Sequence, residues 1–240
     1  MTLIVALEGP EGIVMAADSR GTIGDPRGLT AINDIQKKLF KLTNHAGISV
    51  SGSSELAARL IDTLSAGLPQ IDAENVDAIL NHSIQVMRQE FTGWFGSKPW
   101  AAPQQIIDQR PQVTFILAGF NMRETPPRSR IFLVTSQLDF APQLCQNGFM
   151  LAGIPQYAIY LMHRLYDKQM GLKSLRGLAA YLITETATQD PKVGGPIHMA
   201  EITGSKGFCE LDDTTIGAIL RSNEEQSRKL REFFFKWGAS

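Results

Sequence analysis

The chain carries a threonine directly after Met1, and this residue could do chemistry. Removal of Met1 would leave Thr2 with a hydroxyl and a free α-amine on the same residue, so that a nucleophile and a base arrive together. The reference pKa of an α-amine, about 7.7 to 8.0, lies close to neutrality. The alternative interpretation is an ordinary first residue of an edge strand, where β-branched residues are common.

Two charged residues downstream could join Thr2. Asp18 ends the second apolar stretch, in AADSR, where a hairpin that begins at Thr2 returns close to its start. Lys38, in QKKLFKL, has alternating neighbours that could point it inward while Lys37 points outward. Taken alone, each also fits a plain structural role, as a strand-end aspartate or as one of two solvated lysines.

The elements that must position these residues are strands that come in pairs. Residues 2–8 and 12–19 are short runs rich in Ile and Val around the turn-forming GPEG, and 37–42 and 47–52 form a second pair around TNHA. Further strands are expected at 113–120, 130–136 and 147–153, and a last hairpin at 197–203 and 206–212.

Helical spacing of apolar residues separates these groups of strands. It predicts helices around 56–64, 76–94, 157–170 and 175–183, and a last helix that begins at a Ser222-x-x-Glu225 capping box. The segment 97–111 has three prolines and no clear period, so we expect a loop there. Because the strands come in hairpins, the sheets should be antiparallel with helices layered on them. We therefore expect one α+β domain over 1–240, a four-layer αββα sandwich.

Composition narrows the class of protein. The 240 residues are 43% hydrophobic and 20% charged with a formal net charge of −1, which supplies no basic field for nucleic acid. No apolar run approaches the roughly 20 residues that span a bilayer. The two cysteines, Cys145 and Cys209, are far apart and suit a reducing compartment, so we expect a cytoplasmic protein that is neither membrane-bound nor disulfide-linked. The four histidines have no metal-ligand spacing, so neither a metal nor another cofactor is expected.

Three segments together carry a family resemblance. The stretch from Thr2 to Arg20, which ends GIVMAADSR, resembles the amino terminus of proteasome β-type subunits, the N-terminal threonine hydrolases. KKLFKL followed by GISVSG resembles their lysine strand and the glycine-bearing strand after it, and DPKVGGPIHMAEIT resembles their Asp-x-x-Ser-Gly-Gly segment. The resemblance runs across most of the chain, with 97–111 as the main departure, and implies the Ntn-hydrolase fold. The chain looks like bacterial single-gene homologues, such as the Anbu-like proteins, that start with Met-Thr and lack a propeptide.

The resemblance implies roles for individual residues. Thr2 would become the amino-terminal nucleophile, and Lys38 would lie beside its hydroxyl, paired with Asp18. Either Lys38 or the Thr2 amine could be the base, and the choice stays open. Asp190 matches a second active-site aspartate, and the backbone N–H of Gly52 matches an oxyanion donor. The substrate pocket would include four further residues: Gly21, Thr22, Val50 and Ser54.

Two positions depart from the family pattern. Ala152, in LAGIP, and Val193, in DPKVGG, stand where active relatives place serines. Their loss removes hydroxyls that would hydrogen-bond around the Thr2 amine, which puts the activity in doubt but not the fold. Three functions therefore stay open: a threonine peptidase, a catalytically weak or inactive structural ring subunit, and a small-molecule Ntn amidase.

The resemblance also implies partners. A homo-oligomeric ring, stacked as a double ring with the threonines facing an enclosed chamber, would admit unfolded polypeptides or peptides. The chain has no ATP-binding loop of its own, so any ATPase unfoldase would be a separate protein. The helix around 157–170 has apolar residues on more than one face, which favours burial against a neighbouring copy.

Overall fold

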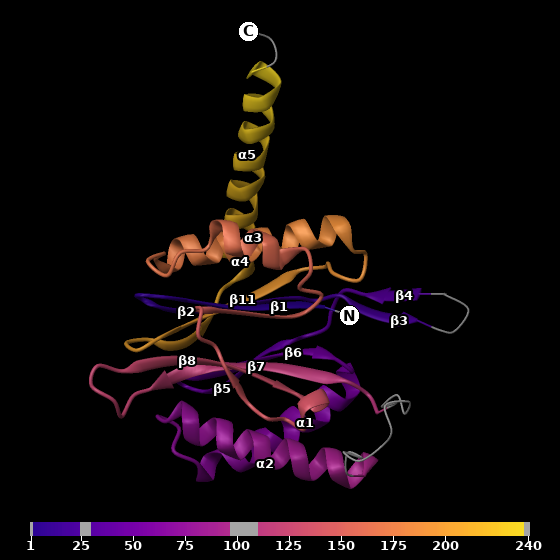
Figure 1. The fold of residues 1–240 in the computed structure, drawn as a ribbon, viewed down its shortest axis with the longest axis vertical. Coiled ribbons are helices and arrows are strands. Elements are labelled where there is room, and N and C mark those ends of the chain that lie inside the picture. The colour runs from indigo at the N-terminus through magenta and orange to yellow at the C-terminus, as the bar shows by residue number, and fades with distance from the viewer. Residues whose placement is uncertain (1, 25–29, 97–109, 238–240) are drawn as a thin grey trace.

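The computed structural model describes residues 2–24, 30–96 and 110–237, and these residues form four stacked layers (Figure 1). Two five-stranded antiparallel sheets lie face to face in the middle. The helices α3 and α4 cover the outer face of one sheet, and α1 and α2 cover the outer face of the other (Figure 1). The expected αββα sandwich is therefore confirmed, and a fifth helix, α5, projects from the α3–α4 layer.

The first sheet holds the amino-terminal hairpin in its interior. Its strand order is β10-β1-β2-β11-β12. The bounds are Leu3–Gly9 for β1, Gly12–Asp18 for β2, Phe149–Gly153 for β10, Ile197–Thr203 for β11 and Gly207–Glu210 for β12. Ile4 lies opposite Ala17 in the β1–β2 register, so the hairpin brings Asp18 back to the beginning of β1, as the sequence predicts.

The second sheet has the order β5-β6-β7-β8-β9, and a separate two-stranded ribbon stands beside the sandwich. The bounds of the sheet are Leu39–Thr43 for β5, Ala46–Gly52 for β6, Val113–Asn121 for β7, Arg128–Thr135 for β8 and Gln143–Leu144 for β9. The ribbon pairs β3, Gly21–Gly24, with β4, Thr30–Asn33. Sequence patterns predicted all of these strands except β3, β4 and β9, which are too short to show a period.

The helices follow the predicted spacing of apolar residues. Their bounds are Ser54–Gly67 for α1, Val76–Phe95 for α2, Ala158–Leu165 for α3, Leu172–Gln189 for α4 and Asp213–Trp237 for α5, with 3-10 turns at Leu68–Gln70 (η1) and Ser136–Leu138 (η2). Asn75 caps α2, since its side chain accepts the N–H groups of Asp77 and Ala78. In the described part of the chain, no helix has both the length and the apolarity that crossing a bilayer requires.

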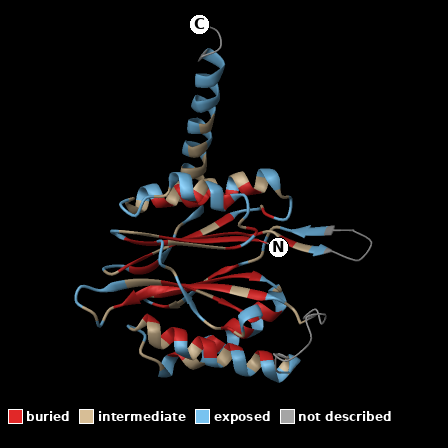
Figure 2. Cartoon of the chain, in the orientation of Figure 1, coloured by how far each residue is buried: buried red, intermediate tan, exposed pale blue. Residues whose placement is uncertain are grey.

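Three clusters of buried side chains hold the layers together (Figure 2). One lies between α1, α2 and the second sheet, and another lies between α3, α4 and the first sheet. The third fills the space between the two sheets, where Ile4, Met15 and Ile116 have no exposed surface. Both faces of β1 and β2 are therefore covered, which explains why these strands read as continuous apolar runs rather than as an alternation.

Two expectations about the ends of elements need correction. The last helix does not begin at Ser222: α5 begins at Asp213, where the Asp212 carboxylate accepts the N–H of Thr215 at 2.7 Å and so caps the first turn. Ser222 lies inside α5. The helix expected over 157–170 ends at Leu165. The predicted loop at 97–111 lies almost wholly outside the described residues.

Candidate active site

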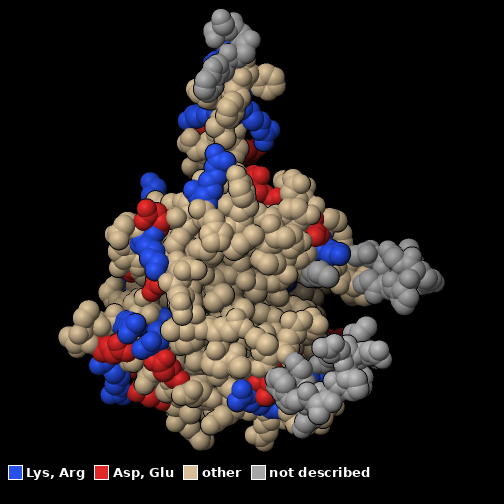
Figure 3. All heavy atoms as spheres, in the orientation of Figure 1, with Lys and Arg blue, Asp and Glu red and all other residues tan. Residues whose placement is uncertain are grey.

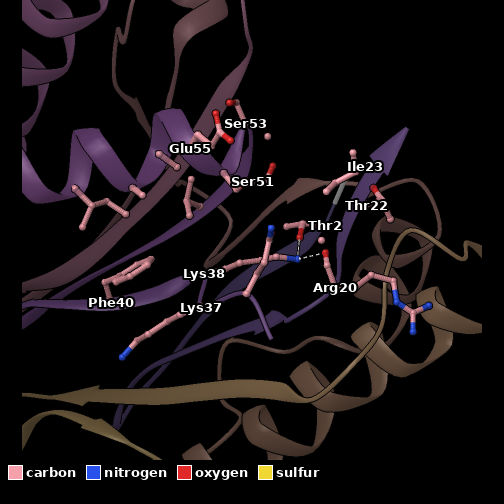
Figure 4. Close-up of a pocket in the computed structure, with 18 residues that line it drawn as sticks. Thr2, Arg20, Thr22, Ile23, Lys37, Lys38, Phe40, Ser51, Ser53 and Glu55 are labelled. Carbon is pink, nitrogen blue, oxygen red and sulfur yellow. Dashed lines mark hydrogen bonds between the residues drawn. The ribbon is translucent and has the colours of Figure 1, made fainter. Parts of the chain in front are cut away.

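Thr2, Asp18 and Lys38 meet in one buried hydrogen-bonded group. The Thr2 hydroxyl lies 2.9 Å from Asp18 Oδ1, and Lys38 Nζ lies 3.0 Å from the same carboxylate oxygen. Lys38 Nζ also contacts Thr2 Oγ1 directly (Figure 4). None of the three residues is more than 5% exposed. The structure thus brings together the three residues that the sequence predicted to act as nucleophile, cation and anion.

The backbone around Asp18 explains how an anion can be buried here. Its Oδ1 accepts the N–H of Leu3 at 3.0 Å, and its Oδ2 accepts the N–H groups of Arg20 and Gly194 at 3.1 Å each. Together with Lys38 and Thr2, these donors surround both carboxylate oxygens. A buried charge is tolerated when it is paired and hydrogen-bonded in this way.

The environment of Lys38 changes its acidity. Burial lowers the pKa of Lys38 below its usual 10.5, while the charge and hydrogen bond of Asp18 act against this shift. Its Nζ also donates to the carbonyl of Arg20 at 2.7 Å, and the backbone carbonyl of Lys38 accepts the N–H of Val50 at 2.9 Å. The side chain is therefore held at both ends, and its proton is easier to release than that of an exposed lysine.

The position of Thr2 itself depends on Gly153. The Thr2 carbonyl accepts the N–H of Ile154 at 2.8 Å, in the turn that follows β10. Gly153 has φ +94°, and a Cβ at this position would lie 1.8 Å from the Thr2 carbonyl oxygen. Only glycine allows this backbone conformation and this close approach together. Sequence reasoning did not single out Gly153, although it noted the LAGIP segment.

A cleft of about 600 Å³ opens beside Thr2. All five residues predicted for substrate binding line it: Gly21, Thr22, Val50, Gly52 and Ser54. The amino-terminal turn of α1 also lines the cleft, and Lys37 and Ile23 lie at its edge (Figure 4). Ala57 and Ile61 are buried beside Val50, so one wall of the cleft is apolar.

Asp190 lies apart from this group in its direct contacts. Its Oδ1 accepts the N–H of Lys192 at 2.9 Å, and its carbonyl accepts the N–H of Val193. Within the described residues, no hydrogen bond or ion pair joins Asp190 to Thr2 or Lys38. It shapes the turn that carries Gly194 to Asp18, so its predicted catalytic part stays a prediction.

Arg20 connects the segments around the site, a role that the sequence gave no sign of. Its guanidinium forms a two-pronged ion pair with Asp34, with both N–O distances 2.8 Å, and donates to the carbonyl of Pro191 at 3.0 Å. The hydrogen bond from the Arg20 side chain to the Asp34 carboxylate lowers the pKa of Asp34. Since the carbonyl of Arg20 also binds Lys38, one residue ties the segment after β4 and the turn after α4 to the buried lysine. Arg20 and Asp34 are distant in the sequence, and only the fold pairs them.

The two departures from the family pattern are core residues in the structure. Ala152 lies opposite Ile4 in the β1–β10 register and is 6% exposed, and Val193 has no exposed surface. Each packs into an apolar cluster next to the site. Among the described residues, no group of three or more His, Cys, Asp or Glu side chains could hold a metal ion.

Comparisons with known proteins agree with this geometry. Residues 2–75, which include Thr2, Asp18 and Lys38, match the family model described as "Proteasome subunit". A proteasome subunit beta of Gordonia bronchialis is 23% identical over 94% of this chain and 75% of its own length. That of Mycolicibacterium vanbaalenii is 22% identical over 97% of this chain and 74% of its own. The chain is related to bacterial proteasome β-type subunits.

Solved structures place this proteasome-type chain in the same fold. An Anbu mutant from Hyphomicrobium sp. strain MC1 superposes with a TM-score of 0.73 over 98% of this chain and 97% of that one, at 18% sequence identity. At this identity the likeness shows the fold alone, which is that of the Ntn hydrolases. The resemblance to bacterial proteasome β-type subunits stated from the sequence is thus confirmed, and the Anbu structure shares the fold.

Proposed function

We propose that the chain is a threonine-type peptidase whose nucleophile is the hydroxyl of Thr2. The observation that carries the proposal is the contact of that hydroxyl with both Lys38 and Asp18 at the inner end of a substrate-sized cleft. A hydroxyl is a weak nucleophile until a neighbouring group takes its proton. Burial and the lowered pKa of Lys38 favour such a transfer.

The reaction would proceed in two steps. Thr2 Oγ1 attacks the peptide carbonyl while its proton passes to a base, and that proton then goes to the leaving amine as the C–N bond breaks. An ester between Thr2 and the acyl half of the substrate remains, and water hydrolyses it. The backbone N–H of Gly52, in the cleft wall, is proposed to stabilise the oxyanion.

The proposal requires Thr2 to be the first residue of the working protein. Its α-amine is then the second candidate base, and the two bases belong to one coupled site. The hydroxyls absent at Ala152 and Val193 would have bound this amine, so we expect slower proton transfer than in a subunit that keeps both serines.

The experiment combines intact mass with covalent labelling. We expect the purified chain to lack the mass of Met1 and to be labelled once by a peptide epoxyketone or boronate. Thr2→Ala should abolish the labelling, and the matched variant Thr63→Ala, which removes an exposed hydroxyl on α1, should leave it unchanged. A labelled Thr2→Ala protein would rule out this mechanism.

A second candidate function is a structural ring subunit without activity. Ala152 and Val193 favour it, because the side chains at these two positions have no hydroxyl that could hydrogen-bond the Thr2 amine. A chain that keeps Met1, resists labelling and still assembles would support this candidate. Turnover of small amides but not of peptides would instead indicate a small-molecule amidase.

We also propose that the chain assembles into a ring with the Thr2 sites inside. Support comes from α3, where Ile159 is 37% and Tyr160 63% exposed, an apolar surface suited to a neighbouring copy. Such an enclosure would restrict the substrates to unfolded polypeptides and peptides, which a separate ATPase would deliver. Electron microscopy of the purified chain tests this: a ring is expected, and a monodisperse monomer would contradict it.

A further inference from the structure

The helix α5 carries its apolar face well beyond the body of the molecule. At its base, Ile216 is 5% exposed and Asn223 donates from its amide to the Gly177 carbonyl of α4 at 2.9 Å. The same face continues at the helical spacing with Leu230 and Phe234, which are 57% and 61% exposed. Figure 2 shows this outer part of α5 as exposed, standing clear of the α3–α4 layer.

A groove lies where α4 and α5 meet. It has a volume of about 380 Å³. Its walls include three large apolar side chains, Leu165, Leu178 and Leu230, together with Tyr181. Polar residues of α5, among them Ser227, complete one side. The groove is thus apolar, open, and beside the helix whose outer half exposes large apolar side chains.

The charges of α5 differ between its two halves. Residues 213–226 contain three acidic and one basic side chain, and residues 227–237 contain four basic and one acidic. Figure 3 shows Lys and Arg side chains along the projecting part. Two such helices placed antiparallel would set each acidic half against a basic half. Their helix dipoles would then be antiparallel, which is also a favourable arrangement.

We propose that two copies of the chain pair antiparallel through α5, with Phe233 and Phe234 of each copy in the α4–α5 groove of the other. Phe234 lies seven residues beyond Ser227, a distance of roughly 10 Å along the helix. The aromatic pair of one helix therefore reaches the base of its twofold-related partner when the axis passes near Ser227. The contact is isologous, with each copy giving and receiving the same surface.

The register places specific charges together. Glu224 and Arg231 are seven residues apart, so they lie on one flank of the helix. With the twofold axis near Ser227, Glu224 of one copy faces Arg231 of the other. This surface meets α3 only at Leu165, the last residue of that helix, and is separate from the Thr2 cleft, so the proposal does not rest on catalytic activity.

A lipid surface is the competing occupant, since aromatic and basic residues on one helix also suit a bilayer interface. A second copy is favoured because the chain itself supplies both the receiving groove and the acidic half that matches the basic half. A bilayer would leave the groove and the acidic half without a role.

The test measures self-association of the full chain by sedimentation velocity. Phe234→Ser should raise the dissociation constant of the α5-dependent step about 100-fold or more, because two copies of a large buried side chain are lost from each interface. Phe235→Ser is the matched control: Phe235 is 84% exposed and lies off the apolar face, so association should not change. Equal effects of the two variants would overturn the proposal.

Charge reversal and cross-linking test the register. Glu224→Arg and Arg231→Glu should each weaken the α5-dependent association, and the double variant should restore it.

Cross-linking provides a second test of the register. In a Cys209→Ser background, Ser227→Cys should form a disulfide between copies, whereas Glu225→Cys, on the opposite side of the helix, should not. A wild-type chain with no α5-dependent association would refute the pairing. Retention of the chain on anionic phosphatidylglycerol vesicles, lost in Phe234→Ser, would refute it in favour of lipid.

Discussion

The first strand and the last helix of the described chain both carry dense runs of large apolar residues, but they bury them differently. Every residue from Leu3 to Leu7 has no exposed surface, because β1 lies between a helical layer and the opposite sheet. On α5, Phe233 and Phe234 are more than half exposed. One copy therefore brings Thr2, Asp18 and Lys38 together by itself, whereas the pairing proposed above would cover the α5 surface only with a second copy.

The largest effect is expected from removing the buried cation. Lys38→Ala should slow covalent labelling of Thr2 by a factor of about 10² to 10⁴, the usual range for a positioned proton-transfer group. The measurement is the rate of probe attachment in a folded sample. Lys41→Ala, which removes an exposed lysine of β5, the strand that follows Lys38, is the control and should label at the original rate.

Gly153 tests the packing of the amino-terminal strand. Gly153→Ala adds a Cβ that cannot fit beside the Thr2 carbonyl, so it should lower the free energy of unfolding by about 2 to 4 kcal/mol and slow labelling as Thr2 moves. Gly96 has a similar positive φ, +74°, but nothing lies within 4 Å of an added Cβ. Gly96→Ala should therefore cost only about 1 kcal/mol of backbone strain. Thermal unfolding of the two variants compares them, and equal losses would contradict the role given to Gly153.

The pH dependence of labelling distinguishes the two candidate bases. Asp18 raises the pKa of Lys38 against the effect of burial. Removing this charge in Asp18→Asn should lower the pKa of Lys38 further, so the acid limb of the pH–rate profile should move to lower pH if Lys38 is the base. If the α-amine of Thr2 is the base instead, its own pKa sets the acid limb, and Lys38→Arg should leave the position of that limb unchanged. Asp72→Asn, at a distant ion pair with Arg123, serves as the control.

The smallest effect is expected at the far end of α5. For dilute, dissociated chain, Phe234→Ser should change the free energy of unfolding by no more than about 0.5 kcal/mol, as is usual for an exposed side chain. The labelling rate of Thr2 should also stay the same. Chemical denaturation at low protein concentration measures this. A large loss of stability there would mean that α5 is held by its own chain, and the contrast with β1 would disappear.

Much of the fold could be predicted because its signals are local. The β1–β2 and β5–β6 hairpins have β-branched runs around short polar turns, and α1 and α2 have apolar residues at helical spacing. The ribbon β3–β4 was not predicted because each of its four-residue strands has only one large apolar side chain, Ile23 or Ile32. The start of α5 was misplaced because Ser222 and Glu225 fit a capping box by type, while Asp212 makes the actual capping contact.

The candidate site also has features that the sequence predicts and features that only the fold reveals. The residue types and order of Thr2, Asp18 and Lys38 are visible in the sequence, and so is the absence of serines at Ala152 and Val193. The close approach of Gly153 to Thr2 and the ion pair of Arg20 with Asp34 could not be predicted, because each joins residues that are distant along the chain.

The sequence by itself determined the alternation of strands and helices and the chemical groups available near the amino terminus, since propensity, periodicity and residue type are local properties. Only the tertiary structure decided that those groups share one buried pocket, that Lys38 is desolvated and its pKa lowered, and that the apolar face of α5 extends into solvent. Burial depends on which distant segments pack together, and it is burial that places a threonine, a lysine and an aspartate in one desolvated, hydrogen-bonded group.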